Sequence, residues 1–175
     1  MSRYAGVAWS RHVSNTFLDR AKWTCDDLGI PSLDDLMACM AWESAETFSP
    51  RVKNGAGSGA TGLIQFMPKT AIGLGVTVEI LERMTAEDQL NYVWKYFKPY
   101  KGRLKNLGDL YMAILWPAGI GKSDDYVLWN KEDRPTTYIQ NKGLDVNKDG
   151  AITRGECLVK VNAMLAKGKR PENTL

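Results

Sequence analysis

The chain has 175 residues, a formal net charge of +3 and 25% charged residues of both signs. This length predicts a single domain over residues 1–175, and a hydrophobic content of 44% supplies enough side chains for a core. The mixed charge excludes long disorder, and without a dense Lys/Arg cluster we expect no nucleic-acid partner. No window reaches the roughly 18 apolar residues of a membrane-spanning helix.

The N-terminal residues and the cysteines predict where the protein is made. The residues after Met1 include Arg3, Trp9 and Arg11 and form no apolar segment, so we expect no signal peptide. An odd number of scattered cysteines favours reduced, buried thiols, which are Cys25, Cys39 and Cys157. We therefore expect synthesis in the cytoplasm.

One acidic residue interrupts an apolar helical pattern near the middle of the N-terminal half. Ser32 and Asp35 have the spacing of a helix start, which predicts a helix over residues 33–47. Leu36, Met40 and Glu43 fall on one side of this helix, because residues three and four apart are neighbours. A carboxylate that continues an apolar stripe lies either at the rim of the core or in a cleft.

The rest of the chain predicts a mainly α fold. Four glycines occur in the loop over residues 54–62, and the apolar segment after it leads into a helix at Pro68. We predict no strand, and residues 121–135 read as irregular. The remaining apolar residues with helical spacing predict helices over 7–28 (one helix or two), from Thr85 to Pro99, over 107–116 and over 156–166.

Several motifs resemble the soluble-lytic-transglycosylase family of the lysozyme-like superfamily. The pair Glu43-Ser44 is followed by Gly62-Leu63-Ile64-Gln65-Phe66-Met67-Pro68-Lys69-Thr70-Ala71, which matches the family pattern G-L-M-Q-x-M-P-x-T-A except at Ile64. A third motif, A-Y-N-A-G-x-G, has its counterpart at residues 115–121, where Trp116 and Pro117 replace Tyr and Asn. A fourth element, a Tyr before an aliphatic residue, has two candidate counterparts, Tyr138-Ile139 and Tyr126-Val127. We prefer Tyr138, because it directly follows Thr136-Thr137. The resemblance covers residues 33–140.

This resemblance implies a lysozyme-like helical domain that cleaves the β-1,4 bond between N-acetylmuramic acid and N-acetylglucosamine in peptidoglycan. It implies that Glu43 is the catalytic acid, with a pKa raised by partial burial. No second carboxylate is an obvious partner, since Glu46, one turn away, reads as a solvated residue. The residues implied as substrate contacts are Ser44, Gln65, Met67, Trp116 and Tyr138.

Residues 145–156 fit the calcium-binding loop of an EF-hand at every position that the pattern fixes. Gly150 allows the sharp turn, Ile152 is expected to pack inward, and no organic cofactor is indicated. The helix expected before the loop, residues 135–142, is short, and a lone loop of this kind suggests a structural role for Ca²⁺. The predicted oxygen ligands come from Asp145, Asn147, Asp149, the Ala151 carbonyl, Thr153 and Glu156.

Three functions remain open at this point. The first is a lytic transglycosylase, with a hydrolysing muramidase on the same scaffold as its nearest alternative. We expect a monomer that acts on peptidoglycan strands of Gram-negative bacteria, either as a bacteriophage lysis enzyme in the periplasm or carried in the virion. The second is a non-catalytic glycan-binding phage protein, which Trp116 and Pro117 keep open. The third is a calcium-dependent interaction protein, which leaves the block from Glu43 to Ala71 unexplained.

Overall fold

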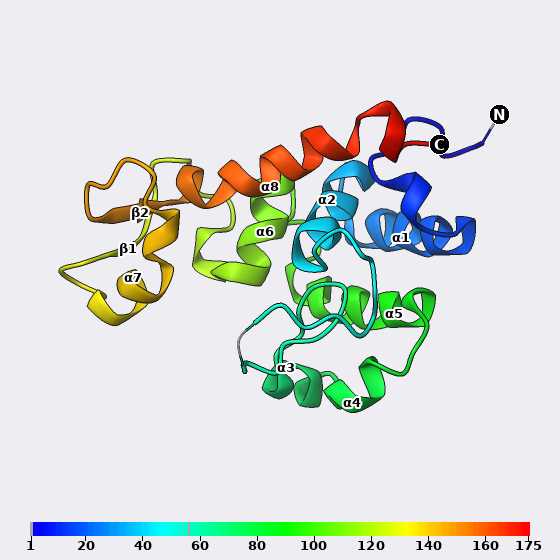
Figure 1. Cartoon of the computed structure of the whole chain (residues 1–175), viewed down its shortest axis with the longest axis horizontal. Coiled ribbons are helices and arrows are strands. Elements are labelled where there is room, and N and C mark those ends of the chain that lie inside the picture. Colours follow the sequence, from blue (N-terminus) through cyan, green and yellow to red (C-terminus); the bar gives the residue numbers. More distant parts are fainter. Residues whose placement is uncertain (1, 56) are drawn as a thin grey trace.

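The computed structural model describes residues 2–55 and 57–175, and it is mainly helical with one small two-stranded sheet. The long helix α8 (Arg154–Gly168) runs along one side of the molecule, with α2 (Leu33–Glu43) and α6 (Leu107–Leu115) packed against it (Figure 1). One end of α8 adjoins the sheet, and the other lies beside the two chain termini. The predicted mainly α class is confirmed.

The other elements surround these three helices. The strands β1 (Val127–Asn130) and β2 (Ala151–Thr153) pair antiparallel, with an irregularity between Val127 and Trp129. Short 3-10 turns cover Ser10–His12, Lys98–Tyr100, Pro117–Gly119, Lys142–Leu144 and Pro171–Asn173. The remaining helices are α1 (Asn15–Leu28), α3 (Pro68–Gly73), α4 (Val78–Leu81), α5 (Ala86–Phe97) and α7 (Pro135–Asn141).

Side-chain caps explain where the helices begin. The hydroxyl of Ser32 accepts a hydrogen bond from the backbone N–H of Asp35 at 3.2 Å, which confirms the predicted start of α2. Thr85 caps α5 in the same way through Asp88, at the predicted start of this helix. At α8, Thr153 and Glu156 form a complete capping box. Each cap satisfies an amide that the first turn of a helix leaves without a partner.

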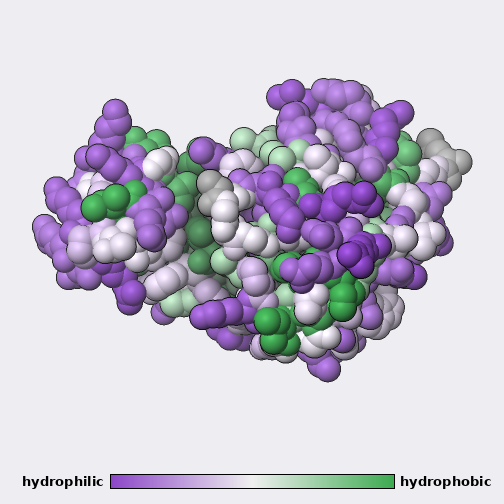
Figure 2. Space-filling model, turned by 60° about the horizontal axis from the view of Figure 1, so that its bottom comes forward, coloured by the Kyte–Doolittle hydropathy of each residue, from purple (hydrophilic) through white to green (hydrophobic). Residues whose placement is uncertain are grey.

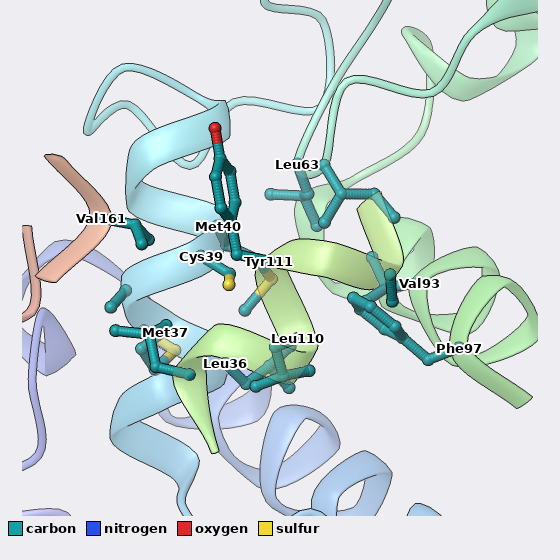
Figure 3. Packing of buried hydrophobic residues seen from close by; sticks show 14 of the residues in the cluster. Leu36, Met37, Cys39, Met40, Leu63, Val93, Phe97, Leu110, Tyr111 and Val161 are labelled. Carbon is teal, nitrogen blue, oxygen red and sulfur yellow. The ribbon is translucent and has the colours of Figure 1, made fainter. Parts of the chain in front are cut away.

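Helix α2 is the centre of the core. Six consecutive residues, 36–41, are buried, because α1, α6 and α8 cover α2 from different sides. Its residues Leu36, Met37 and Met40 lie among side chains of α6, α8 and the segment around Leu63 (Figure 3). A helix that is hydrophobic all round belongs in an interior. The three cysteines are buried and free, which confirms their predicted state.

Three features differ from the prediction. Helix α2 ends at Glu43 rather than near residue 47, because Ala45 and Glu46 adopt left-handed backbone angles (φ 50° and 66°). Helix α4 is too short, at four residues, to produce a periodic pattern. Strand β1, in residues 121–135, has four residues and β2 has three, so neither is long enough to show an alternating pattern in the sequence.

The surface carries small apolar patches. Seen from the side of α3 and α4 it is mostly hydrophilic, with separate hydrophobic areas (Figure 2). Ile72 of α3 and Ile80 of α4 are exposed. Within residues 2–55 and 57–175, no helix is long and apolar enough to cross a membrane.

Candidate functional site

The C-terminal end of α2 delivers Glu43 into a surface groove of about 480 Å³. This volume is in the range of small-ligand sites, roughly 300–1,000 Å³. Three separate parts of the chain form its walls: the end of α2, the loop that follows it, and α8. The groove is lined by Trp42, Glu43, Ala45, Glu46, Asn54, Gln65 and Met164. The structure therefore brings together Glu43 and Gln65, two of the residues predicted for the site.

Hydrogen bonds hold the loop against the end of α2. The side-chain amide of Asn54 donates to the backbone carbonyl of Glu43. Gln65 Nε2 donates to the carbonyls of Val52 (3.0 Å) and Gly62 (3.1 Å), and its Oε1 accepts from the N–H of Asn54 (3.1 Å). Gln65 therefore fixes the loop that forms one wall, and its Oε1 keeps one lone pair for a ligand. Ala56 of the predicted glycine-rich loop lies outside the described residues.

Burial raises the pKa of Glu43 from 4.5 to about 7. Glu43 is partly buried and lines the groove, and its surroundings disfavour the charged form of its carboxyl group. At neutral pH a large fraction of Glu43 is thus protonated, whereas an ordinary glutamate has lost its proton. Glu43 can therefore both donate and accept a proton under physiological conditions.

The charge of Glu43 acts on the pKa of two tyrosines on other helices. Burial first, and the charge of Glu43 next, raise the pKa of Tyr111 on α6. The pKa of Tyr96 on α5 rises to about 12, chiefly by burial and with contributions from Tyr100 and Glu43. The Tyr111 hydroxyl lies beside the C-terminal turns of α2 (Figure 3) and accepts a hydrogen bond from the indole N–H of Trp42 at 3.3 Å. Both tyrosines stay protonated and contribute dipoles rather than charge.

The second carboxylate of the groove, Glu46, has an ionic partner. Glu46 forms an ion pair with Lys167 of α8, with 2.5 Å between its Oε1 and the lysine Nζ. The sequence predicted Glu46 to be a solvated residue, whereas the structure pairs it with Lys167 on α8. Among the described lining residues, Glu43 is therefore the one carboxyl group without an ionic partner.

The remaining predicted contact residues lie away from this groove. Ser44 is fully buried, and its hydroxyl accepts the backbone N–H of Phe48 at 3.0 Å, so it stabilises the turn after α2. Met67 is exposed at the start of α3 and does not line the groove. Trp116 lines a separate hollow with Trp129, and Tyr138 donates a hydrogen bond from its hydroxyl to Asp145 at 2.6 Å. Their positions in the sequence motifs, next to or near Glu43 and Gln65, therefore did not predict whether their side chains point into the groove.

Several residues in and around the groove were not predicted from the sequence, among them Asn54, Tyr111 and Met164. Asn54 stands in a glycine-rich loop where a polar residue is unremarkable, and Tyr111 reads as an ordinary core position of α6. Met164 approaches Glu43 from α8, more than a hundred residues further along the chain. Only the tertiary packing of α2 against α8 brings them together, so no local signal could have identified Met164.

In the loop over residues 145–156, side-chain oxygens accept hydrogen bonds from backbone N–H groups of the same loop. Asp145 Oδ2 accepts the N–H of Gly150 at 3.0 Å, and Asn147 Oδ1 accepts the N–H of Asp149 at 3.0 Å. Gly150 has φ +88°, where a side chain would be strained, which confirms the predicted sharp turn. Ile152 is fully buried, also as predicted. The antiparallel partner of β2, at the end of this loop, is β1 of the same chain.

The donor chemistry of this loop fits a calcium ion. The loop carries the carboxylates of Asp145, Asp149 and Glu156, and none of the three forms an ion pair in the part of the chain that the structure describes. Glu156 instead accepts the N–H groups of Val146 (3.0 Å) and Asn147 (3.3 Å). Over the described ranges, no three His, Cys, Asp or Glu side chains are close enough together to hold a metal ion. The loop thus carries oxygen ligands of the type that Ca²⁺ prefers, in the order of the EF-hand pattern. In this structure these oxygens accept hydrogen bonds from backbone N–H groups.

Comparison with family models and with curated proteins does not assign the chain to a family. No protein-family model matches the chain, and no curated protein matches it significantly.

Proposed function

We propose that the protein cleaves the β-1,4 glycosidic bond of peptidoglycan as a lytic transglycosylase, on a lysozyme-like helical scaffold. The observation that carries the proposal is Glu43, a carboxyl group in a groove of about 480 Å³ with a pKa raised to about 7 by burial. The motif resemblance around Glu43 and Gln65 points to the same chemistry. Peptidoglycan strands are the proposed substrate.

In this mechanism Glu43 acts twice. Its protonated carboxyl group first donates a proton to the glycosidic oxygen, which makes that oxygen a good leaving group. The resulting carboxylate then accepts the proton of the muramyl 6-hydroxyl as this oxygen attacks the anomeric carbon, which yields a 1,6-anhydro product. The N-acetyl group of the substrate stabilises the cationic centre between the two steps. A pKa near 7 suits both roles, because either protonation state is accessible at neutral pH.

The state of Glu46 favours this route over hydrolysis. Most hydrolysing glycosidases place a second carboxylate across the scissile bond, as nucleophile or as base for water. Glu46 lines the same groove, but its ion pair with Lys167 holds one of its oxygens. A hydrolysing muramidase that used Glu46 would first have to separate this pair.

Product analysis tests the proposal. Purified peptidoglycan sacculi digested with the protein should release muropeptides that end in 1,6-anhydro-N-acetylmuramic acid, seen by mass spectrometry as a mass one water lower than the hydrolysed product. Turbidity of chloroform-treated Gram-negative cells should fall in parallel. Products with reducing ends only would assign a hydrolysing muramidase, and unchanged turbidity with no products would assign a glycan-binding protein.

We further propose that the loop over residues 145–156 is an EF-hand-type calcium loop with a structural role. The ion would be held by Asp145, Asn147, Asp149, Glu156 and the Ala151 carbonyl, with Thr153 at the remaining position. Its charge would offset three carboxylates in a short loop, and the loop is joined directly to α8. Since α8 carries Met164 into the groove, the loop supports the site through the position of this helix.

Removal of calcium is expected to lower the thermal stability of the protein. A ligand that binds only the folded state raises Tm, so Tm should rise by several degrees from excess EDTA to millimolar CaCl₂, as measured by circular dichroism. Glu156→Gln should abolish this response, and equal MgCl₂ serves as the ion control. The same Tm in EDTA and in CaCl₂ would contradict the calcium assignment.

A further inference from the structure

A second hollow, larger than the Glu43 groove, lies between α1 and α5. Its volume is about 570 Å³, and it shares no lining residue with the groove. Its walls carry both aromatic and polar side chains, among them Arg20, Trp23, Asp88, Asn91, Tyr92 and Trp94. The mechanism proposed above uses none of these residues.

Two indole rings form the aromatic wall of this hollow. Trp94 is held in place, because its N–H donates to Asp27 at 2.8 Å and Lys98 Nζ lies 4.8 Å from its ring centroid. Trp23 stands beside it with 5.8 Å between ring centroids at an interplanar angle of 49°. Trp23 is 55% exposed, and its N–H has no hydrogen-bond partner among the described residues. Trp94 thus gives the wall a ring held in one position, and Trp23 gives it an exposed ring face and an N–H group that can donate to a ligand.

The polar side of the hollow carries no net charge. Arg20 Nη1 pairs with Asp88 at 2.8 Å, so the guanidinium and the carboxylate cancel. The amide of Asn91 is exposed and has no hydrogen-bond partner in the described part of the chain. A neutral hollow does not attract a phosphate or an isolated carboxylate. Paired charges and a free amide are suited to hydroxyl and acetamido groups, which donate and accept hydrogen bonds without carrying charge.

We propose that this hollow binds a neutral N-acetylated pyranose ring of a glycan strand, at a site separate from the Glu43 groove. The C–H face of the sugar lies on the indole of Trp23, and its hydroxyl and acetamido groups bond to Asn91 and to the Arg20–Asp88 pair. The choice of a glycan as ligand rests on the proposed function, because the substrate there is a polymer long enough to meet a second site. Such a site would raise the residence time of the protein on intact sacculi.

Indole signals separate the two sites in one experiment. The Glu43→Gln protein, labelled with ¹⁵N, is titrated with chitohexaose, a soluble β-1,4-linked N-acetylglucosamine hexamer. The indole N–H cross-peaks of Trp23 and Trp42 are assigned from Trp23→Phe and Trp42→Phe, because Trp23 lines the hollow and Trp42 lines the groove. We expect the Trp23 cross-peak to shift and saturate. A Trp23 cross-peak that stays unmoved overturns the inference, whether or not Trp42 responds.

The same titration distinguishes this inference from the proposed function. A shift at Trp23 with none at Trp42 supports the second site and counts against the groove as a glycan site. A shift at Trp42 alone supports the groove and overturns the second site. Each of the two hypotheses therefore has its own reporter.

Binding to sacculi measures how much the hollow contributes. In the Glu43→Gln background, Trp23→Ala should weaken co-sedimentation with sacculi by roughly three- to tenfold, the usual value of one aromatic contact. Val159→Ala, an exposed apolar residue on α8, is the matched control and should leave binding unchanged. Val159→Ala should leave Tm nearly unchanged, whereas Trp23→Ala also removes the ring contact with Trp94 and should lower Tm by a few degrees at most, with the protein still folded at the assay temperature. Equal binding by Trp23→Ala and Val159→Ala would contradict the proposal.

Discussion

Glu43→Gln should abolish peptidoglycan cleavage while leaving the protein folded. The amide has the shape of the carboxyl group but cannot transfer its proton, and general acid–base catalysis contributes roughly a hundredfold to ten-thousandfold in rate. Release of soluble muropeptides from sacculi, measured by chromatography, should therefore fall by at least about a hundredfold. Glu46→Gln, in the same groove, should cause a much smaller loss, because Glu46 is already paired with Lys167. Equal loss in both variants would indicate a mechanism with two carboxylates.

The same substitution should stabilise the protein at alkaline pH. The pKa of Glu43 is about 7 in the folded chain against an ordinary 4.5, so between these pH values the folded state holds a proton that the unfolded state has released. The contribution of Glu43 to the free energy of unfolding therefore falls as the pH rises from 4.5 to 7. Glu43→Gln removes the penalty and should raise the free energy of unfolding at pH 8 by up to about 3 kcal/mol, with little change at pH 4. Urea denaturation at both pH values measures this difference.

Arg154→Met should destabilise the fold strongly. Arg154 is 5% exposed, and its Nη2 lies 3.0 Å from Oδ1 of Asp109, which is itself only 2% exposed. This pair joins the start of α8 to the start of α6, and Asp109 also accepts the N–H of Gly121 at 2.8 Å. Without the guanidinium group, the buried carboxylate of Asp109 keeps only hydrogen bonds from backbone N–H groups. Leaving such a charge without its ionic partner lowers the free energy of unfolding by roughly 3–5 kcal/mol. The free energy of unfolding in urea should fall by about this amount.

Two further variants identify the cause of that loss. Adding Asp109→Asn to Arg154→Met should recover part of the stability, because the neutral amide carries no buried charge. Arg170→Met, at an exposed position after α8, should change stability by roughly 0.5 kcal/mol or less. If the double variant were less stable than Arg154→Met, the loss would come from packing of the arginine side chain rather than from an unpaired charge.

Local patterns predicted much of the helical framework. Ser32 and Thr85 are capping residues whose effect extends only three positions, so α2 and α5 could be located from sequence. The end of α2 could not, because the left-handed turn at Ala45 and Glu46 depends on Ser44 bonding to Phe48 inside the core. Strand β1 could not be located either, because its four residues are too few to alternate and the strand that it pairs with, β2, lies about twenty residues further on.

The candidate site was predicted in part. Glu43 and Gln65 do meet, although Gln65 chiefly fixes the loop rather than facing open solvent with a free amide. The burial that raises the pKa of Glu43, and the pairing of Glu46 with Lys167, both depend on how α8 packs against α2. Such contacts join residues about 120 positions apart, which no local pattern encodes.

The most direct test is a measurement of the pKa of Glu43 itself. The ¹³C chemical shift of its side-chain carboxyl carbon, followed by NMR from pH 3 to pH 9 and assigned by comparison with Glu43→Gln, reports the protonation of this one group. The shielded groove predicts a midpoint of about 7. A midpoint near the ordinary 4.5 would mean that Glu43 holds no proton at neutral pH, and it would contradict the proposed role of Glu43 as the catalytic acid.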